Sequence, residues 1–491
     1  MTRRSVLGSL TALSYSRVRG ANDRVGVGFI GYGLIGAQHV YDFSHQDDAN
    51  LVALSETFEP RLQQGVEVCN RKSGGTTRPY RDFRRLLDDK DVDAVVVCTP
   101  DHWHALMTML ACAAGKDVYV EKPMTLFVRE GRWMADVARR HKRIVQVGTQ
   151  QRSGKHYRAA FDLMRQGHIG KVVSVHMGTS RNVTPGFGKP EGPQPENFNY
   201  DMWLGPAPAH AYSPHRGLYH FRWFWDFSGG QMTNLGAHEI DILQWFLGQK
   251  GPTAVTSSGG RFALEDDGET PDVQDALFEY PGFTATWSER EVSSGRRAGY
   301  GTEFFGTRGS LVISRAGWEL FPDTKTSPSN AIPVFQGQPE GGPQRVKVEP
   351  ELLMQPGKMA GSSNEQFDLH VRGFLDCVKS RQKPIADAED GHRNQQRHAQ
   401  HIQRNSQRHE TLRWNLGYEK HDEAGNQHIA RMVFEARAMV ISRGIHGQKP
   451  GASQHENSER ERTVKAPKPQ WHPVPKGRCV KTVGHGVIIS V

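Results

Sequence analysis

The sequence predicts an α/β fold whose N-terminal part is a doubly wound parallel sheet, and three observations lead to this prediction. Short apolar runs typical of buried strands recur between residues 25 and 148. Segments with a helical pattern separate these runs, so strand and helix alternate along the chain. A glycine-rich turn joins the first strand to the first helix. Strands that alternate with helices pair in parallel, because each helix returns the chain to the same edge of the sheet.

The glycine turn is Gly31-Tyr32-Gly33-Leu34-Ile35-Gly36, and it directly follows the apolar, partly β-branched run 25–30. Residues 37–43 then continue as a helix. The first glycine permits a tight turn, the second removes a Cβ that would block a pyrophosphate, and the third lets helix and strand approach closely. The free N–H groups of the helix start bind phosphate. The turn therefore predicts a dinucleotide site with contacts from Gly31, Gly33, Leu34, Ile35 and Gly36.

A carboxylate stands at the end of the second predicted strand. Glu56 closes the run 51–56 and lies 20 residues beyond Gly36. An acid at this place accepts hydrogen bonds from the adenosine ribose hydroxyls and repels a 2′-phosphate. The sequence therefore favours NAD over NADP as the cofactor. NADP is the alternative, since Arg61 could bind a 2′-phosphate if Glu56 pointed away.

Three further strands are predicted at residues 93–98, 116–120 and 143–148, with a helix over 104–114 between the first two. Ligands of doubly wound sheets bind beyond the carboxyl ends of the strands. The side chains at these ends are therefore candidate cofactor contacts: Thr99, Glu121, Lys122 and Gln150.

The composition excludes several classes of protein. With 36% hydrophobic residues and a mean hydropathy of −0.62, the 491-residue chain has no apolar run long enough to span a bilayer. The net charge of +9 comes from residues 393–491, which hold 17 basic and 8 acidic side chains, whereas the rest holds 45 of each. We therefore expect no nucleic-acid partner for the body of the protein. The five cysteines form no CxxC pair, so neither a disulfide framework nor a metal site is predicted.

Residues 1–22 have the pattern of an export signal. The pair Arg3-Arg4 precedes a short apolar run, 6–13, that cannot span a membrane. A pair of arginines in this setting resembles the twin-arginine signal that exports folded proteins. The sequence therefore predicts a periplasmic or otherwise exported protein. A cytoplasmic protein with a basic N-terminus is the alternative, because Arg17 and Arg19 lie where a cleavage region is normally uncharged.

Four motifs occur in an order and at spacings that resemble the Gfo/Idh/MocA oxidoreductases, the family of glucose–fructose oxidoreductase and myo-inositol dehydrogenase. They are the glycine turn, Thr99-Pro100-Asp101-His102-Trp103-His104, Gly115-Lys116-Asp117-Val118-Tyr119-Val120-Glu121-Lys122-Pro123 and Gly229-Gly230-Gln231-Met232-Thr233-Asn234-Leu235-Gly236-Ala237-His238. The resemblance covers about residues 24–393. It implies a bound NAD(P), a carbohydrate substrate and a homo-oligomer, either dimer or tetramer. It also adds Pro100 and His104 to the expected cofactor contacts.

The domain organisation follows from the same resemblance. Residues 23–150 are expected to form a Rossmann domain, and residues 151–393 an α/β domain with a large, open, mainly antiparallel sheet. Strand-like stretches at 172–179 and 276–287 and a helical pattern at 364–380 are compatible with this second domain.

The tail, residues 394–491, departs from the family pattern. Residues 394–410 are rich in Gln, His, Arg and Asn, and residues 446–480 have a composition typical of disordered segments. A local change of reading frame in the gene is one explanation, and a regulatory or basic binding tail is the other. Resequencing the gene distinguishes the two.

The resemblance assigns chemical roles to three residues. Oxidation of an alcohol needs a hydride acceptor, a base for the hydroxyl proton and a cation that favours the alkoxide. The family's lysine in this position lies beside the nicotinamide and the substrate hydroxyl, which assigns the cation to Lys122. His238 is the candidate acid/base, since imidazole titrates near neutral pH. Family members commonly have an acid four positions earlier, where this sequence has Asn234. An amide can orient the imidazole but cannot stabilise its charge, which puts the usual Lys-Asp-His proton relay in doubt.

Three further residues are candidate substrate contacts beside His238. Arg152 leaves the last strand of the first domain towards the cleft, and Trp203 and Tyr219 could stack on a sugar. The leading hypothesis is hydride transfer between nicotinamide and a secondary hydroxyl or keto group of a sugar, polyol or sugar derivative. If the protein is exported, the dinucleotide travels tightly bound. The alternatives are NAD-dependent glycoside cleavage by oxidation and elimination, and a non-catalytic dinucleotide-dependent sensor.

Overall fold

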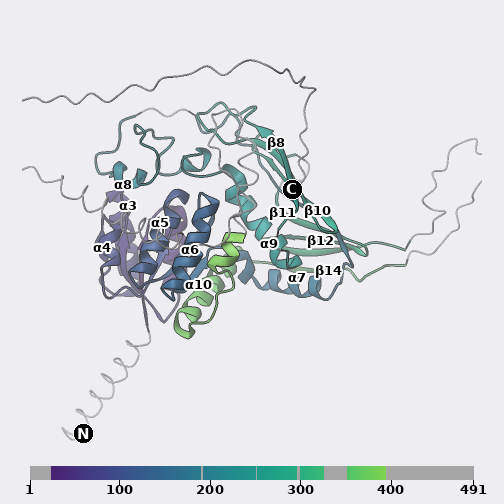
Figure 1. Ribbon diagram of the computed structural model, residues 1–491, viewed down its shortest axis with the longest axis horizontal. Helices are drawn as coiled ribbons and strands as arrows, with labels where there is room; N and C mark the ends of the chain where they lie inside the picture. The colour runs from purple at the N-terminus through teal and green to yellow at the C-terminus, as the bar shows by residue number, and fades with distance from the viewer. Residues whose placement is uncertain (1–23, 189–191, 250, 296–298, 326–350, 394–491) are drawn as a thin grey trace, which may run out of the picture. The chain divides into compact units, whose positions relative to one another are not determined.

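The computed structural model describes residues 24–188, 192–249, 251–295, 299–325 and 351–393 (Figure 1). Two segments singled out in the sequence, the export signal at 1–22 and the tail at 394–491, lie outside these residues. The described part contains two β-sheets, each with helices packed against it. No helix within this part is long and apolar enough to cross a membrane.

The first sheet has six parallel strands in the order β3-β2-β1-β4-β5-β6. The strands are β1 (Val25–Ile30), β2 (Ala49–Ser55), β3 (Arg78–Tyr80), β4 (Ala94–Val97), β5 (Asp117–Val120) and β6 (Val145–Val147). The chain leaves β1 first in one direction along the sheet and later in the other, as in dinucleotide-binding folds. The predicted doubly wound parallel sheet is therefore confirmed. The sequence does not predict β3, because none of its three residues is buried.

Helices cover both faces of this sheet. α2 (Leu34–Ser44) contacts α3 (Glu59–Ser73), and α5 (Asp101–Ala113) contacts α6 (Val128–Arg140). The short helix α4 (Phe83–Leu87) lies between β3 and β4 in the chain. Right-handed connections place the first pair of helices on one face of the sheet and the second pair on the other.

The last described helix, α10 (Ser363–Ser380), returns to the first sheet. Val371 and Phe374 are completely buried in the core of that sheet. Phe374 packs edge-on against Phe43 of α2 and Tyr119 of β5. The predicted helix is therefore confirmed, but it packs on the first sheet although its residues lie within the range expected for the second domain.

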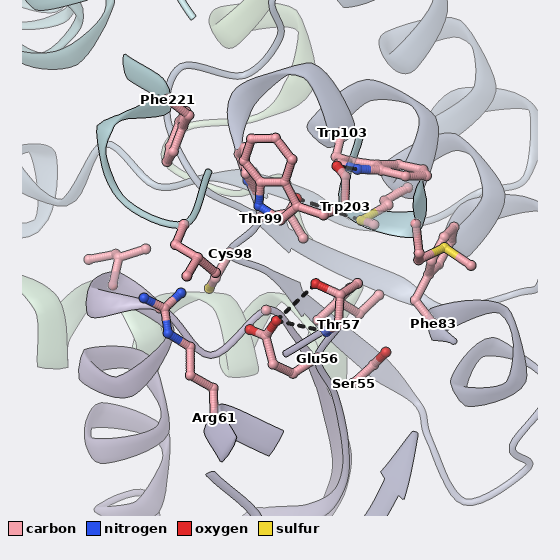
Figure 2. A pocket seen from close by; sticks show the side chains of 18 of the residues that line it. Ser55, Glu56, Thr57, Arg61, Phe83, Cys98, Thr99, Trp103, Trp203 and Phe221 are labelled. Atoms are coloured by element: carbon pink, nitrogen blue, oxygen red, sulfur yellow. Dashed lines mark hydrogen bonds between the residues drawn. The ribbon is translucent and has the colours of Figure 1, made fainter. Parts of the chain in front are cut away.

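The carboxyl edge of the first sheet gathers the predicted ligand side chains. Ser55 ends β2, Glu56 and Thr57 follow it, and Cys98 and Thr99 follow β4 (Figure 2). The glycine turn joins β1 to α2 at the same edge, because neighbouring parallel strands all end there.

The second sheet has eight strands in the order β14-β13-β12-β11-β7-β10-β9-β8. The strands are β7 (Val172–Ser180), β8 (Ala254–Gly260), β9 (Val273–Tyr280), β10 (Phe283–Arg290), β11 (Gly299–Gly306), β12 (Gly309–Ser314), β13 (Gly317–Pro322) and β14 (Gly357–Ala360). Only β7 and β10 pair in parallel, so the expected mainly antiparallel sheet is confirmed. The strand-like stretch at 276–287 is in fact a hairpin, because Pro281 and Gly282 form a turn between β9 and β10.

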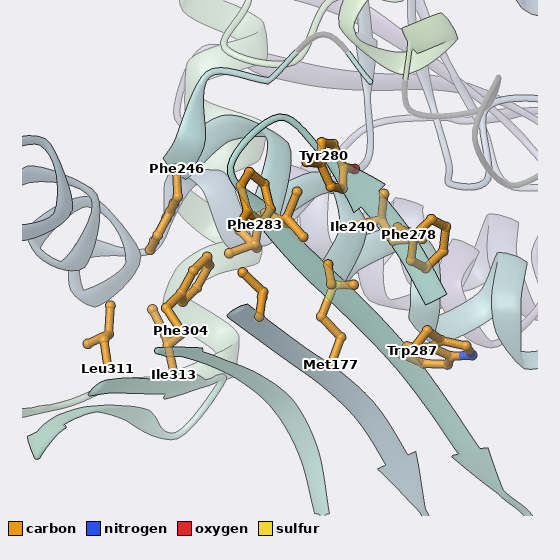
Figure 3. Packing of buried hydrophobic residues seen from close by; sticks show 14 of the residues in the cluster. Met177, Ile240, Phe246, Phe278, Tyr280, Phe283, Trp287, Phe304, Leu311 and Ile313 are labelled. Atoms are coloured by element: carbon orange, nitrogen blue, oxygen red, sulfur yellow. The ribbon is translucent and has the colours of Figure 1, made fainter. Parts of the chain in front are cut away.

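One face of the second sheet carries a helical layer. α7 (Lys155–Arg165) and α9 (Ala237–Leu247) pack on this face and share its core. Figure 3 shows Ile240 and Phe246 of α9 above Met177, Trp287 and Phe304 of the strands. Alternate side chains of β9 and β10 are buried here, which is the pattern of a half-covered strand. This packing holds the start of α9, and therefore His238, in place.

The segment between β7 and β8, both strands of the second sheet, includes an aromatic cluster. It contains α8 (Tyr200–Leu204), the 3₁₀ turn η2 (His220–Trp223) and the π-helical turn η3 (Met232–Gly236), while the 3₁₀ turn η1 (Gln150–Ser153) follows β6. The buried members of the cluster are Phe198, Tyr200, Trp203, Leu204, Phe221, Trp223, Phe224 and Phe227. The carbonyl of Trp203 accepts a hydrogen bond of 2.8 Å from the Trp103 indole of α5, which joins this cluster to the first domain.

Candidate functional site

The glycine turn combines two glycines required by the protein's own packing with one that is not. Gly31 has φ +93°, and a Cβ there would lie 2.8 Å from the Cys98 carbonyl oxygen. A Cβ on Gly36 would lie 2.3 Å from the Gly31 carbonyl oxygen. A Cβ on Gly33 would meet only a guanidinium nitrogen of Arg61, at 3.9 Å. The space beside Gly33 therefore fits a ligand that approaches the backbone closely, as a pyrophosphate does at such a turn.

Gly33→Ala is expected to leave the folded protein stable and to weaken dinucleotide binding at least tenfold, roughly the effect of losing one good contact. Gly36→Ala is expected to destabilise the protein by about 1–3 kcal/mol, because its Cβ overlaps the backbone. Thermal denaturation and fluorescence titration with NADH measure the two effects. Unchanged affinity in Gly33→Ala would contradict the phosphate assignment.

The turn opens onto a cleft between the first domain and the aromatic cluster (Figure 2). The predicted residues Gly31, Gly33, Leu34, Ile35, Glu56, Thr99, Pro100, Trp203 and Tyr219 all line it. Arg222 lies over the rings of Tyr219 and Phe221, with its guanidinium carbon 5.4 and 4.7 Å from the ring centres. Leu34 is 72% exposed, so its apolar surface is free to contact a ligand.

Backbone donors hold Glu56 at the end of β2. One carboxylate oxygen accepts from Tyr32 N–H at 2.8 Å, and the other from Thr57 N–H and Phe58 N–H at 2.7 and 3.0 Å. The second oxygen also accepts from the Thr57 hydroxyl at 3.2 Å, so acceptor capacity for a ribose hydroxyl is left on the oxygen bonded by Tyr32. Arg61 lines the same end of the cleft. The structure therefore brings together both residues that the sequence singled out for the choice between NAD and NADP.

Five expected cofactor contacts do not line the cleft: Gly36, His104, Glu121, Lys122 and Gln150. Three of them bond to other groups of the first domain. Glu121 is buried, and one of its oxygens accepts from His39 and from Gln150, both at 2.7 Å. Burial raises the pKa of Glu121, but the His39 hydrogen bond and charge outweigh it and leave the pKa below its usual value. The ring nitrogens of His104 bond the carbonyls of Pro123 and Thr99 at 2.7 and 2.8 Å. Glu121, Gln150 and His104 bond to groups of the protein itself, and their predicted contacts with the cofactor stay predictions.

Lys122 forms a contact between the two domains. It follows β5, and its Nζ donates to the backbone oxygen of Asn234 at 3.0 Å and to its side-chain Oδ1 at 2.9 Å. Burial, helped by the positive charges of Arg222 and Arg315, lowers the pKa of Lys122 to about 8. The structure thus places a lysine that can lose its proton near neutral pH against the residue that replaces the family's acid.

His238 lies in the first turn of α9 and is only 2% exposed. Its Nδ1 has no hydrogen-bond partner within the described residues. Burial, together with the positive charges of Arg315 and Lys122, lowers its pKa well below the usual value. The imidazole is therefore neutral at pH 7, and its Nδ1 is buried.

Arg152, expected to bind substrate, forms an ion pair inside the protein. Its Nε and one terminal nitrogen both donate to Asp241 at 2.7 Å, and its other terminal nitrogen donates to the Ile385 carbonyl at 2.9 Å. Arg152 and Asp241 are both buried. These contacts give Arg152 a structural role, and its predicted contact with the substrate stays a prediction.

Trp203 and Tyr219 line the cleft at the side of the glycine turn. Trp203 is buried in the aromatic cluster, whereas Tyr219 is 50% exposed. Of the two, Tyr219 has more surface available to a ligand. Most of the Trp203 ring packs within the aromatic cluster, so the ring mainly forms one side of the cleft.

Two residues near the site are absent from the sequence-based prediction. Arg315, in the turn between β12 and β13, acts electrostatically on both Lys122 and His238. Gln231 accepts a hydrogen bond of 3.1 Å from the Asn234 side chain. No motif in the sequence points to Arg315 as a site residue. Gln231 stands inside the motif that contains Asn234 and His238, so its position is the signal that could have found it.

Family models match two parts of the chain. The NAD-binding Rossmann fold of an oxidoreductase family, GFO_IDH_MocA, matches residues 25–149, and the C-terminal alpha/beta domain of that family matches residues 187–259. Myo-inositol 2-dehydrogenase of Thermotoga maritima is 25% identical over 289 residues, 58% of this chain and 74% of the relative. A glycosyl hydrolase family 109 protein of Shewanella baltica is 31% identical over 155 residues, only 31% of this chain and 34% of the relative.

Solved structures share the fold. A levoglucosan dehydrogenase in complex with NADH and levoglucosan superposes with a TM-score of 0.58 at 16% identity, over 79% of this chain and 98% of that one. At this identity the likeness concerns the fold. It confirms the predicted combination of a Rossmann domain with a mainly antiparallel second domain.

Proposed function

The chain belongs to the Gfo/Idh/MocA family of oxidoreductases, and we propose on this basis that it oxidises or reduces a sugar, polyol or sugar derivative with NAD(P). Hydride moves between the nicotinamide and a secondary hydroxyl or keto carbon. One observation carries the proposal: Lys122 of the first domain meets Asn234 of the second, at the carboxyl edge of a dinucleotide-binding sheet. The named relatives act on inositol and levoglucosan, which supports a polyhydroxylated substrate.

In this proposal the protein's own residues orient the substrate and move its proton. Lys122 donates a hydrogen bond to the reacting oxygen and favours its alkoxide character. Asn234 holds the lysine in place, and His238, whose pKa the charge of Lys122 helps to lower, is the second candidate for proton transfer. The nicotinamide, when bound, supplies the hydride acceptor or donor. Tyr219, with its exposed ring at the cleft, is the proposed contact for the sugar face.

The position of Glu56 supports NAD as the cofactor, since its carboxylate repels a 2′-phosphate. Arg61 would serve NADP instead. Titration of the purified protein with NADH and NADPH, followed by nicotinamide fluorescence, distinguishes the two. Tighter binding of NADPH would overturn the choice of NAD.

A panel of sugars and polyols with NAD and NADP tests the proposed reaction. We expect at least one cyclic polyol or sugar to produce reduced nicotinamide. If chromogenic glycosides are cleaved without net reduction, the glycoside-cleavage alternative replaces the proposal. If dinucleotide binds but no member of the panel reacts, the sensor alternative gains support. The short match to the glycosyl hydrolase relatives does not favour cleavage, because it extends over only 34% of their length.

Export and assembly are further parts of the proposal. The twin arginine at residues 3–4 supports export of the folded protein with its dinucleotide bound. Mass spectrometry of protein purified from the periplasmic fraction tests this: absence from that fraction, or absence of nicotinamide, counts against it. Exposed apolar side chains on the open face of the second sheet, Leu277, Val312 and Phe321, support a homo-oligomer. Light scattering gives its size.

A further inference from the structure

A chain of side-chain hydrogen bonds extends from Lys122 into the second domain. Asn234 accepts from Lys122 at 2.9 Å and donates through Nδ2 to Gln231 Oε1 at 3.1 Å. Gln231 donates through Nε2 to Glu291 at 2.8 Å. Arg181 in turn donates to the two oxygens of Glu291 at 2.6 and 2.7 Å. Gln231 and Glu291 are each 1% exposed, so water does not compete for these bonds.

The two ends of this chain determine the direction of every amide within it. An ionised carboxylate only accepts hydrogen bonds, and an ammonium only donates them. Glu291 therefore requires the NH₂ group of Gln231, which turns the Gln231 oxygen towards Asn234. Asn234 must then donate with its own NH₂ group, which turns its oxygen towards Lys122. The ammonium form of Lys122 selects this orientation by itself, whereas a neutral Lys122 could also accept from the NH₂ group, so Gln231 is what keeps the oxygen towards a neutral lysine.

We propose that Gln231 is a positioning residue that orients the Asn234 amide, so that Lys122 meets a neutral oxygen in place of a carboxylate and itself takes the substrate's hydroxyl proton. The proposal rests on the proposed oxidoreductase function. In the oxidation, the hydroxyl proton moves to the Nζ lone pair, the carbinol hydride leaves with its electron pair to the nicotinamide, and the C=O bond forms. Reduction reverses each transfer, so atoms and electrons balance.

The charges around Lys122 agree with this role. The groups that act on it are Glu121, Asp101, Arg222, Arg315 and His238. Glu121 is engaged by His39 and Gln150, and Asp101 accepts from the Ser228 hydroxyl. With burial as the largest cause, the pKa of Lys122 is about 8, so a sizeable fraction is neutral near pH 7.5. His238 is the weaker base, because burial and nearby positive charge hold its pKa well below the usual value.

Two variants and their combination test the proposal. Gln231→Met removes the orienting bonds at similar volume, and Asn234→Asp supplies a carboxylate whose oxygens are equivalent, so that orientation no longer matters. Gln244→Met, which alters a buried glutamine of α9, is the matched control. The pKa of Lys122 is measured in the cofactor-free protein by competitive acetic anhydride labelling and mass spectrometry. Initial rates against pH are measured with the best substrate of the panel.

The expected results separate orientation from general packing. Asn234→Asp raises the Lys122 labelling pKa and moves the rise of kcat to higher pH, since a carboxylate stabilises the ammonium. Gln231→Met lowers the labelling pKa and reduces kcat about tenfold, the scale of one lost hydrogen bond. In the double variant Gln231→Met/Asn234→Asp, the Lys122 labelling pKa stays close to that of Asn234→Asp alone. Its kcat stays within about twofold of the Asn234→Asp value, a small fraction of the effect of one hydrogen bond. Gln244→Met leaves both unchanged.

Equal effects of Gln231→Met with and without Asn234→Asp would overturn the positioning role. If Gln231→Met does not fold, Asn234→Asp decides alone: an unchanged Lys122 labelling pKa would overturn the proposal. The labelling needs neither substrate nor cofactor. A protein without dehydrogenase activity but with the expected labelling shifts would therefore refute the proposed function and leave the orientation of Asn234 intact.

Discussion

Replacing Lys122 with methionine is expected to lower kcat about 1,000-fold, within the range for loss of a positioned acid/base. Methionine keeps the length of the side chain but cannot donate a hydrogen bond to the substrate oxygen or exchange its proton. The variant should still bind NADH, because Lys122 lies outside the residues that line the dinucleotide cleft. Steady-state kinetics and NADH fluorescence titration measure the two properties.

The control for this variant is Lys171→Met, which alters an exposed lysine that directly precedes β7. Its kcat should equal that of the wild type. Retention of more than about a tenth of wild-type kcat in Lys122→Met, a loss smaller than acid/base catalysis supplies, would mean that another group carries the proton. The wild-type rate should rise with pH around pH 8, because the lowered pKa of Lys122 makes its neutral form available there.

Arg152→Met is expected to destabilise the protein by about 3–5 kcal/mol, because it removes the guanidinium that forms a buried ion pair with the Asp241 carboxylate. The double variant Arg152→Met/Asp241→Leu should recover most of this loss, since it removes both charges. Urea denaturation followed by circular dichroism gives the free energy of unfolding for each protein. Arg139→Met, at an exposed ion pair with Glu389, should cost no more than about 1 kcal/mol.

The same variants separate a structural role of Arg152 from substrate binding. If Arg152 only supports the fold, the KM of the folded double variant should stay within about twofold of wild type, well under the effect of one lost hydrogen bond. A KM raised tenfold or more with restored stability would return Arg152 to the substrate site.

The sequence by itself determined the features that depend on local pattern. Apolar runs mark five of the six strands of the first sheet, because a strand buried on both faces needs such a run. The glycine turn is equally local, since Gly31 and Gly36 are required by backbone contacts within the β1–α2 unit and its neighbour β4. Lys122 could be predicted as a site residue because it directly follows a strand, and ligands of such sheets bind at the strand ends.

Tertiary structure alone decided which side chains meet. The sequence marked Arg152, Glu121, Gln150 and His104 as ligand contacts, yet each is engaged by partners within the protein. Likewise, residues 276–287 form two paired strands and α10 packs on the first sheet, and both features depend on contacts between distant parts of the chain. Asn234 shows the limit most clearly. Its identity is plain in the sequence, but the direction of its amide depends on Gln231, Glu291 and Arg181. These residues meet only because the folded chain brings the ends of β7 and β10 beside η3.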